Sequence, residues 1–212
     1  MAFASSTKIR AIVFDLDGTL YVAPDFAATI QNQAAVYMGR IKGVSVEEAR
    51  RLIAATRRRL TDELGSVQTL SAVCIELGGN IRELHALFQE RLRPEACLVR
   101  DERVIGLLRC LRERFHLYIY TNNNHAITSR ILDYLGLGGL FTATFAIDDT
   151  WRAKPDEEIL GKVLAAIRQE PAQVLFVGDR YDVDLRLPEQ KGCPVFLSRN
   201  VEQLLRLEEL LA

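Results

Sequence analysis

The chain has no hydrophobic run long enough to cross a membrane and no large excess of charge. None of its apolar stretches approaches the ~20 residues that a membrane-spanning helix needs. The formal net charge is −1 over 212 residues, so we expect neither a nucleic-acid polymer nor an anionic membrane as a partner. The first ten residues contain no apolar segment, so no secretory signal is expected either.

Cysteine and histidine are also scarce. The sequence has 4 cysteines and 3 histidines, without a Cys-x-x-Cys pair and without the spacing of a zinc site. Widely spaced thiols of this kind are typical of a reduced protein, so a cytoplasmic location is expected. A fold built on disulfides or structural zinc is therefore not expected.

Apolar runs and helical patterns alternate along most of the chain. Runs of suitable length and of β-branched or aromatic content predict five strands: Ile9–Phe14, His116–Tyr120, Thr144–Ile147, Val174–Val177 and Pro194–Leu197. Apolar residues at helical spacing predict four helices between and after the later strands: Arg103–Arg114, Ala126–Leu135, Glu157–Arg168 and Val201–Leu211. Such alternation is typical of an α/β fold with a parallel sheet and right-handed crossovers.

The interval between the first two strands is far longer than a crossover requires. A crossover takes about a dozen residues, whereas this interval contains four further helical patterns: Phe26–Met38, Val46–Leu64, Thr69–Leu77 and Ile81–Leu92. Ser45 with Glu48, and Asn80 with Glu83, have the spacing of capping boxes at two helix starts. We therefore expect an all-helical module inserted into the α/β core.

Two aspartates stand directly after the first predicted strand. Side chains at i and i+2 of a strand point to the same side, so Asp15 and Asp17 should project together, and Gly18 allows the chain to turn away. Neighbouring carboxylates are costly unless a cation or a shared proton relieves their repulsion. The pair could act as nucleophile and general acid–base towards a phosphate, or it could only bind a metal or cap a turn.

Three more polar groups follow later strands. Thr121 and Asn122 could hold phosphoryl oxygens or merely cap the next helix. Lys154, before Pro155, could neutralise an aspartate and a phosphate, although a solvated lysine is the simpler interpretation. The acidic segment 179–184 could bind Mg²⁺ or be a surface turn.

The four groups are expected to meet in space. All stand at the carboxyl ends of predicted parallel strands or in the loops that follow, and this edge is where open α/β sheets bind ligands. Two carboxylate groups, a cation and a hydroxyl would converge there. A phosphate held by Mg²⁺ and lysine and attacked by a carboxylate fits this combination.

Taken in order, these motifs resemble the four motifs of the haloacid dehalogenase (HAD) superfamily. The matching segments are Asp15-Leu16-Asp17-Gly18-Thr19, Tyr120-Thr121-Asn122, Lys154-Pro155 and Gly178-Asp179-x-x-x-x-Asp184. The resemblance implies a Rossmann-like three-layer core of residues 1–22 and 99–212, with an inserted all-helical C1 cap of residues 23–98. It points to the C1-capped phosphatase branch, which includes phosphoglycolate phosphatases and pyrimidine 5′-nucleotidase-like members. Asp17 argues against the dehalogenase branch, which lacks this second aspartate.

The resemblance also implies a role for each site residue. Asp15 would be the nucleophile that forms an aspartyl-phosphate, Asp17 the general acid–base, and Lys154 the cation that stabilises Asp15 and the phosphate. Phosphate binding would involve Asp15, Gly18, Thr121, Asn122 and Lys154. The Mg²⁺ ligands would be Asp15, Asp17 through its backbone carbonyl, Asp179 and Asp184, with Asp182 secondary.

The resemblance implies a Mg²⁺-dependent phosphohydrolase that acts through this intermediate. Its substrates would be small phosphorylated metabolites, such as nucleoside monophosphates or phosphoglycolate, and the protein would be a monomer or homodimer. Two alternatives share the fold: a phosphosugar mutase similar to β-phosphoglucomutase, and a non-catalytic binding protein. The intact set Asp15, Asp17, Thr121, Lys154 and Asp179 argues against the second alternative.

Overall fold

The computed structural model describes residues 8–211. The expectation that the chain starts without a secretory signal rests mainly on residues 1–7, which lie outside the described part. Among the described residues, no helix combines the length and the apolar character that crossing a membrane requires.

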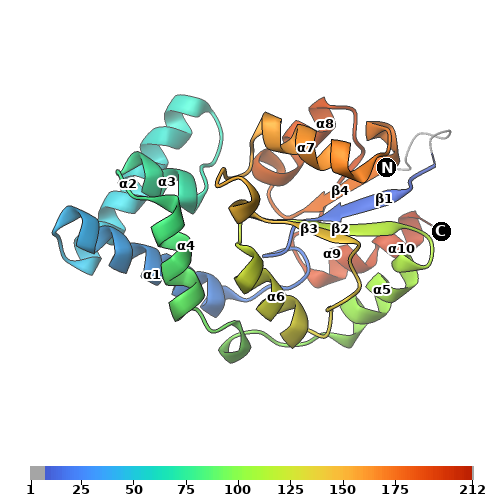
Figure 1. Ribbon diagram of the computed structural model, residues 1–212, viewed down its shortest axis with the longest axis horizontal. Coiled ribbons are helices and arrows are strands. Elements are labelled where there is room, and N and C mark those ends of the chain that lie inside the picture. The colour runs from blue at the N-terminus through green and yellow to red at the C-terminus, as the bar shows by residue number, and fades with distance from the viewer. Residues whose placement is uncertain (1–7, 212) are drawn as a thin grey trace. The chain divides into compact units, whose positions relative to one another are not determined.

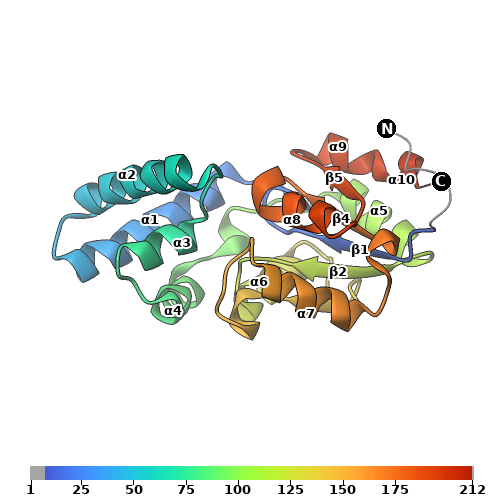
Figure 2. The same ribbon diagram turned by 90° about the horizontal axis from the view of Figure 1, so that it is seen from above.

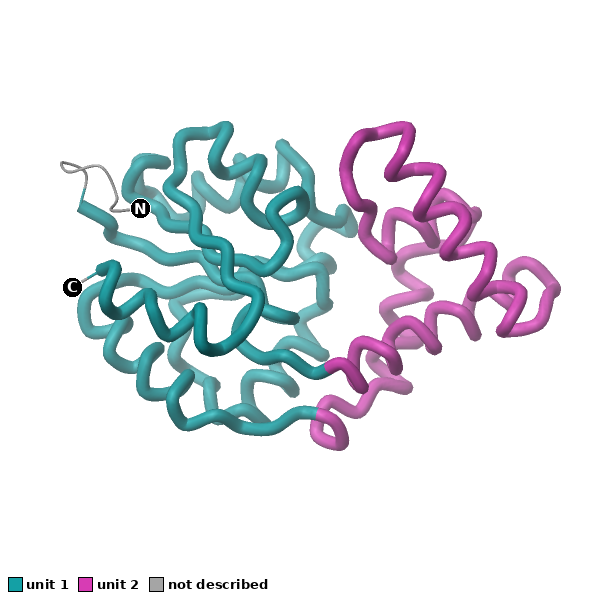
Figure 3. The backbone as a smooth tube through the Cα atoms, turned by 180° about the vertical axis from the view of Figure 1, so that it is seen from behind, with its two compact units in different colours: residues 1–23, 98–212 teal, residues 24–97 magenta. Residues whose placement is uncertain are grey.

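The chain divides into two compact units, coloured separately in Figure 3. One contains the residues up to Ala23 together with those from Leu98 onward, and the other is Pro24–Cys97. The first unit contains a sheet, whereas the second is helical throughout its regular structure. The inserted helical segment that forms the cap therefore interrupts the first unit after its first strand.

The first unit is built on a parallel sheet of five strands in the order β3-β2-β1-β4-β5. The strands are β1 (Ala11–Phe14), β2 (His116–Tyr120), β3 (Ala143–Phe145), β4 (Val174–Gly178) and β5 (Val195–Leu197). Figure 2 labels β1, β2, β4 and β5. Helices cover both faces of the sheet, which makes three layers (Figure 1). The predicted α/β fold class, with a parallel sheet and an inserted helical cap, is confirmed.

The covering helices are divided between the two faces of the sheet. Figure 1 shows α7 and α8 above the sheet and α5, α6, α9 and α10 below it. Their bounds are α5 Glu102–Arg112, α6 His125–Tyr134, α7 Glu157–Ile167, α8 Arg186–Gln190, α9 Val201–Leu205 and α10 Leu207–Leu210. Because α6 follows β2 and α7 follows β3, the loops that precede these two helices lie at the carboxyl edge of the sheet.

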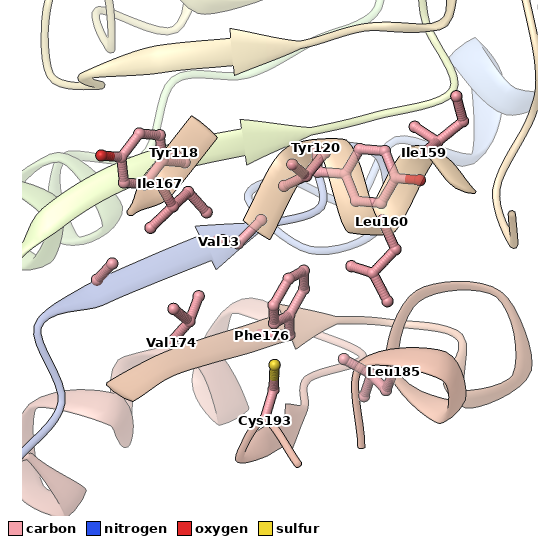
Figure 4. Close-up of a cluster of buried hydrophobic side chains, with 12 residues drawn as sticks. Val13, Tyr118, Tyr120, Ile159, Leu160, Ile167, Val174, Phe176, Leu185 and Cys193 are labelled. Carbon is pink, nitrogen blue, oxygen red and sulfur yellow. The ribbon is translucent and has the colours of Figure 1, made fainter. Parts of the chain in front are cut away.

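The core of the sheet explains why the strands appear in the sequence as continuous apolar runs. All four residues of β1 are buried, because helices cover both of its faces. Alternate residues pack against α7, where Val13, Tyr118 and Phe176 meet Leu160 and Ile167 (Figure 4). This packing leaves the polar residues that follow each strand at the edge of the sheet.

The inserted unit consists of α1 (Pro24–Lys42), α2 (Val46–Leu64), α3 (Leu70–Glu76) and α4 (Ile81–Arg91). The predicted cap residues are present: Ser45 accepts a hydrogen bond from the Glu48 backbone N–H at 3.1 Å, and Asn80 Oδ1 accepts one from the Arg82 backbone N–H at 2.8 Å.

One half of the predicted capping box at Asn80 is wrong. The Asn80 backbone N–H donates to the Tyr37 hydroxyl at 2.7 Å, and Glu83 Oε2 also lies 3.2 Å from that hydroxyl. The hydroxyl of Tyr37 therefore stands between the two groups that the motif would have paired directly. A tertiary contact with α1 has replaced a local hydrogen bond.

Two of the predicted elements differ from the observed ones for a reason that the hydrogen bonds explain. The strand predicted to reach Ile147 stops at Phe145, because the Ile147 N–H bonds to Asn123 O at 3.0 Å and Asp149 Oδ2 accepts from Ala146 N at 2.8 Å. The helix predicted over Val201–Leu211 is divided at Arg206, whose N–H bonds to Gln203 O at 3.2 Å, three residues back. The strand is thus ended by a bond to a distant segment and by a side-chain acceptor, whereas the helix is interrupted by a bond within its own sequence.

Candidate active site

The polar residues of the predicted motifs meet at the carboxyl edge of the sheet. Phe14, the last residue of β1, is in register with Ile119 of β2 and Val177 of β4. Asp15 extends this ladder by one bond, since its N–H donates to Val177 O at 2.8 Å. The residues that follow β1, β2 and β4 are therefore held side by side by the pairing of the strands.

Lys154 is the centre of the site. Its Nζ lies 2.7 Å from Asp15 Oδ1, 2.7 Å from Asp184 Oδ1 and 2.8 Å from the backbone oxygen of Tyr120. These three acceptors match the three hydrogens of an ammonium group. Burial lowers the pKa of Lys154, but the carboxylates of Asp15 and Asp184 outweigh this effect and raise it overall. The buried lysine is therefore charged at neutral pH.

Asn122 holds the main chain of Lys154 in place. Its Oδ1 accepts a hydrogen bond from the Lys154 N–H at 2.7 Å, and its Nδ2 donates to the Lys154 carbonyl at 3.4 Å. The peptide bond between Lys154 and Pro155 is cis. The side chain that follows β2 thus anchors a loop that is distant from it in the sequence.

Three carboxylates could hold a metal ion. Asp15, Asp179 and Asp184 each offer an oxygen within 4.8 Å of the others. Asp179 Oδ1 is buried without a hydrogen-bond partner among the described residues, and the nearby cation is Arg180, whose Nε lies 3.5 Å away. Hard oxygen ligands of this kind suit Mg²⁺. An unsatisfied buried carboxylate oxygen beside two others is what a cation site requires, so these residues fit the ion.

Two glycines allow the acidic loop to approach the strand ends. Gly18 has a φ of +85°, and a Cβ atom on it would lie 2.5 Å from Asp179 Oδ2. A Cβ atom on Gly178 would lie 2.5 Å from the Cβ of Asp184. Contacts this short do not occur between real side chains, so any larger residue at either position would displace a carboxylate of the trio.

Asp17 has a different environment from Asp15. Its Oδ1 accepts a hydrogen bond from the Tyr21 hydroxyl, and its Oδ2 accepts one from Asn123 Nδ2 at 2.6 Å. The buried Tyr21 stays protonated, because burial and the neighbouring charge of Asp17 raise its pKa well above the ordinary value. Asp15 thus faces a cation, whereas neutral donors hold Asp17.

Burial perturbs the acids of the site. It raises the pKa of Asp15 to about 7; the charge of Asp184 adds to this rise and Lys154 opposes it. Burial also raises the pKa of Asp17, against the hydrogen bond from Tyr21. The pKa of Asp179 is raised by burial as well, against the charge of Arg180. Acids with raised pKa values in one site are typical of a functional centre.

The structure brings most of the predicted residues together. Asp15, Lys154 and Asp184 are in direct contact, and Asp179 completes the trio of carboxylates. Thr121 is buried just beyond β2, where its hydroxyl accepts a hydrogen bond from the Asn123 N–H at 3.1 Å. Asp182 lies outside the trio and pairs with Arg186 at 3.5 Å.

Three neighbours of the site were not anticipated as such. Tyr21 and Asn123 bind Asp17, and Arg180 pairs with Asp179 and Asp184. One local signal was available for Asn123, which stands two residues after Thr121 and so could share its side of the chain. The pairing of Tyr21 with Asp17 depends on the turn between them, which the sequence pattern does not specify.

Comparison with known proteins agrees with this geometry. The family model of the haloacid dehalogenase-like hydrolases matches residues 9–189. The chain is 31% identical over 183 residues to an N-acetylmuramic acid 6-phosphate phosphatase of Pseudomonas putida, covering 81% of this chain and 75% of that one. It is 25% identical over 204 residues to a phosphoglycolate phosphatase of Salmonella typhi, covering 88% and 80%. The chain belongs to the haloacid dehalogenase-like hydrolases.

Solved structures share the fold. A HAD phosphatase from Thermococcus onnurineus superposes with a TM-score of 0.65 at 21% identity, covering 96% of this chain and 98% of that one. A HAD-hydrolase from Bacillus subtilis bound to magnesium gives a TM-score of 0.60 at 19% identity, covering 97% and 99%. The family match confirms the motif-based resemblance to the HAD hydrolases, and the solved structures show the same fold.

Proposed function

We propose that this hydrolase is a Mg²⁺-dependent phosphatase that cleaves small phosphate monoesters through an aspartyl-phosphate. The protein is a phosphoric monoester hydrolase of the HAD-like family, and its substrates are small phosphorylated metabolites. The observation that supports this mechanism is the contact of Asp15 with Lys154. The second carboxyl group, Asp17, instead accepts hydrogen bonds from neutral donors. One carboxylate is thus paired with a cation, and another can exchange a proton.

Asp15 is the nucleophile in this proposal. Lys154 occupies its Oδ1, whereas the closest donor to Oδ2 is the Thr19 hydroxyl at 3.4 Å. Oδ2 therefore keeps lone pairs for attack on phosphorus, which forms the bond of an acyl phosphate while the bond to the leaving oxygen breaks. Lys154 offsets charge on Asp15 and on the transferred group.

Asp17 moves the proton in both steps. Its raised pKa favours the acid form that donates to the leaving oxygen, and the resulting carboxylate then accepts a proton from water. The hydroxide attacks phosphorus, the bond to Asp15 breaks, and phosphate leaves with both aspartates restored. Two carboxyl groups with different neighbours can divide these roles.

Asp15, Asp179 and Asp184 would hold the Mg²⁺, together with the backbone carbonyl of Asp17. The ion would supply positive charge that stabilises the phosphoryl oxygens during transfer. The unsatisfied oxygen of Asp179 supports this assignment. The folded chain holds these acids at the edge of the sheet, and other residues of the site would bind the remaining phosphoryl oxygens.

Thr121 is proposed to contact the phosphoryl oxygens through its hydroxyl. Gly18 is proposed to line the phosphate site without donating to it, because its N–H donates to the Tyr21 carbonyl at 2.9 Å. For Asn122 the hydrogen bonds favour an indirect role, because both polar atoms of its side chain bind the main chain of Lys154. Asn122 then places the lysine that meets the phosphate.

The names of two relatives suggest which substrates to test first. These relatives are named for N-acetylmuramic acid 6-phosphate and for phosphoglycolate, both of which carry a carboxylate as well as a phosphate monoester. We propose phosphorylated small organic acids as the first class to test, with nucleoside monophosphates as the second.

The experiment is a panel of phosphate esters assayed for release of inorganic phosphate. The panel contains both compounds named above, several nucleoside monophosphates and glucose 1-phosphate, each with Mg²⁺ and with EDTA in its place. Turnover that requires Mg²⁺ and is absent in Asp15→Asn supports the proposal. Turnover that survives chelation contradicts the metal assignment, and glucose 6-phosphate formed from glucose 1-phosphate without free phosphate identifies a mutase instead.

A further inference from the structure

Asp17 is held at both carboxyl oxygens by side chains from two different loops. The Tyr21 hydroxyl donates to Oδ1, and Asn123 Nδ2 donates to Oδ2 at 2.6 Å. One donor follows β1 and the other follows β2. Two bonds to opposite oxygens define the plane of the carboxyl group, which a single bond would leave free to rotate.

Each donor is itself fixed by backbone hydrogen bonds. Tyr21 closes the turn after β1, where its carbonyl accepts a bond from the Gly18 N–H at 2.9 Å, and the residue is only 6% exposed. The Asn123 N–H donates to Thr121 Oγ1 at 3.1 Å, and its carbonyl accepts from the Ile147 N–H at 3.0 Å. The main chain of each donor is therefore held in place beside Asp17.

We infer that Tyr21, together with Asn123, is a positioning residue that holds the Asp17 carboxyl group in the orientation for proton transfer to the leaving oxygen. The inference rests on the proposed phosphatase function and assigns to that reaction two residues outside its four motif positions. Asn123 also connects Asp17 to Thr121, so the proton donor and a phosphate-binding hydroxyl share one support.

The inference predicts that the loss of rate in a variant depends on the leaving group of the substrate. An alkoxide is a poor leaving group and needs a proton during bond cleavage, whereas p-nitrophenolate departs without one. An Asp17 carboxyl group in the wrong orientation should therefore lower the rate of cleavage far more for alkyl phosphates than for p-nitrophenyl phosphate. Positioned acid catalysis contributes roughly 10²–10⁴-fold to a rate, so a partial loss of position should cost on the order of 10-fold.

The test compares kcat/KM for an alkyl phosphate and for p-nitrophenyl phosphate in wild type, Tyr21→Phe and Asn123→Ser. This parameter reports the first phosphoryl transfer and is insensitive to the later hydrolysis of the intermediate. Tyr118→Phe is the matched control, because it removes the hydroxyl of another buried tyrosine, on β2, that packs against α7. Thermal unfolding checks that each variant is folded.

We expect Tyr21→Phe and Asn123→Ser to lower kcat/KM for the alkyl ester about 10-fold more than for the aryl ester, and Tyr118→Phe to change neither. Equal losses on both substrates, or no loss on either, would overturn the inference while leaving the phosphatase proposal intact. If Tyr21→Phe does not fold, Asn123→Ser decides alone, because Asn123 is only half-buried. Wild-type protein that cleaves neither ester contradicts the proposed function itself.

Discussion

A Cβ atom on Gly18 would lie 2.5 Å from Asp179 Oδ2. The turn after β1 and the loop after β4 therefore touch at a point where only hydrogen fits. Because Asp179 carries the buried oxygen without a hydrogen-bond partner among residues 8–211, this contact connects the geometry of the first motif to the proposed metal site.

Gly18→Ala should weaken Mg²⁺ binding as well as stability. The new methyl group must push Asp179 aside, and alanine at a φ of +85° adds backbone strain of about 1 kcal/mol. Gly192→Ala is the matched control, since Gly192 has a φ of +88° and a Cβ atom there would meet no atom of the described residues within 4 Å. Calorimetric titration with Mg²⁺ should show weaker binding in Gly18→Ala alone. Equal affinities in the two variants would contradict the role given to this contact.

Removal of the central lysine should destabilise the protein strongly. Lys154→Met leaves the carboxylates of Asp15 and Asp184 buried without their shared cation, which should cost about 3–5 kcal/mol in the free energy of unfolding without metal. Urea unfolding measures this loss. Lys162→Met, which removes an exposed lysine paired with Glu158, should change stability by less than about 0.5 kcal/mol.

The double variant Lys154→Met/Asp15→Asn provides the internal check on this prediction. It removes one buried negative charge together with the cation, so it should be more stable than Lys154→Met alone. Additive losses would mean that the two side chains do not interact.

The two acidic positions of the fourth motif should differ in function. Asp184→Asn removes a carboxylate of the trio and should abolish most Mg²⁺-dependent turnover, whereas Asp182→Asn only removes a half-exposed partner of Arg186. The latter variant should therefore retain most of the wild-type kcat/KM. The reverse result would exchange the roles of the two aspartates.

The stability of the metal-free protein should fall as the pH rises from about 4 to 7. The pKa of Asp15 is 3.8 in its ordinary state and about 7 in the fold, so the folded state holds its proton over this range while the unfolded state has lost it. The contribution of Asp15 to stability is therefore fully present below pH 3.8 and is lost as the pH rises through about 7.

Urea unfolding in EDTA at several pH values measures this dependence. Asp15→Asn cannot titrate, so the slope should be flatter in this variant by up to ~1.4 kcal/mol per pH unit. Saturating Mg²⁺ should reduce the difference, since the cation offsets the buried charge. Parallel curves in EDTA would show that Asp15 keeps its ordinary pKa.

Local patterns were sufficient for the order and type of most elements. The run His116–Tyr120 and the helix Val46–Leu64 were predicted with the bounds that the structure has. Their patterns are continuous and end at turn or capping residues. The prediction for Val201–Leu211 was less accurate, because its apolar spacing does not reveal the break at Arg206.

Hydrogen bonds between distant segments were beyond the reach of those patterns. Tyr37 replaced the expected partner of Asn80, and Ile147 left its predicted strand to bond with Asn123. Both changes join residues that are far apart in the sequence. A window of neighbouring residues contains no information on such contacts.

The sequence by itself determined the parallel α/β core, its inserted helices and the chemical types gathered at the strand ends, because apolar periodicity and motif order are local properties. Only the tertiary structure decided how those groups pair. It placed Lys154 between Asp15 and Asp184, left an oxygen of Asp179 unsatisfied, and set Tyr21 and Asn123 on either side of Asp17. These pairings depend on strand register and on loops that meet at one edge of the sheet, which are properties of the folded chain alone.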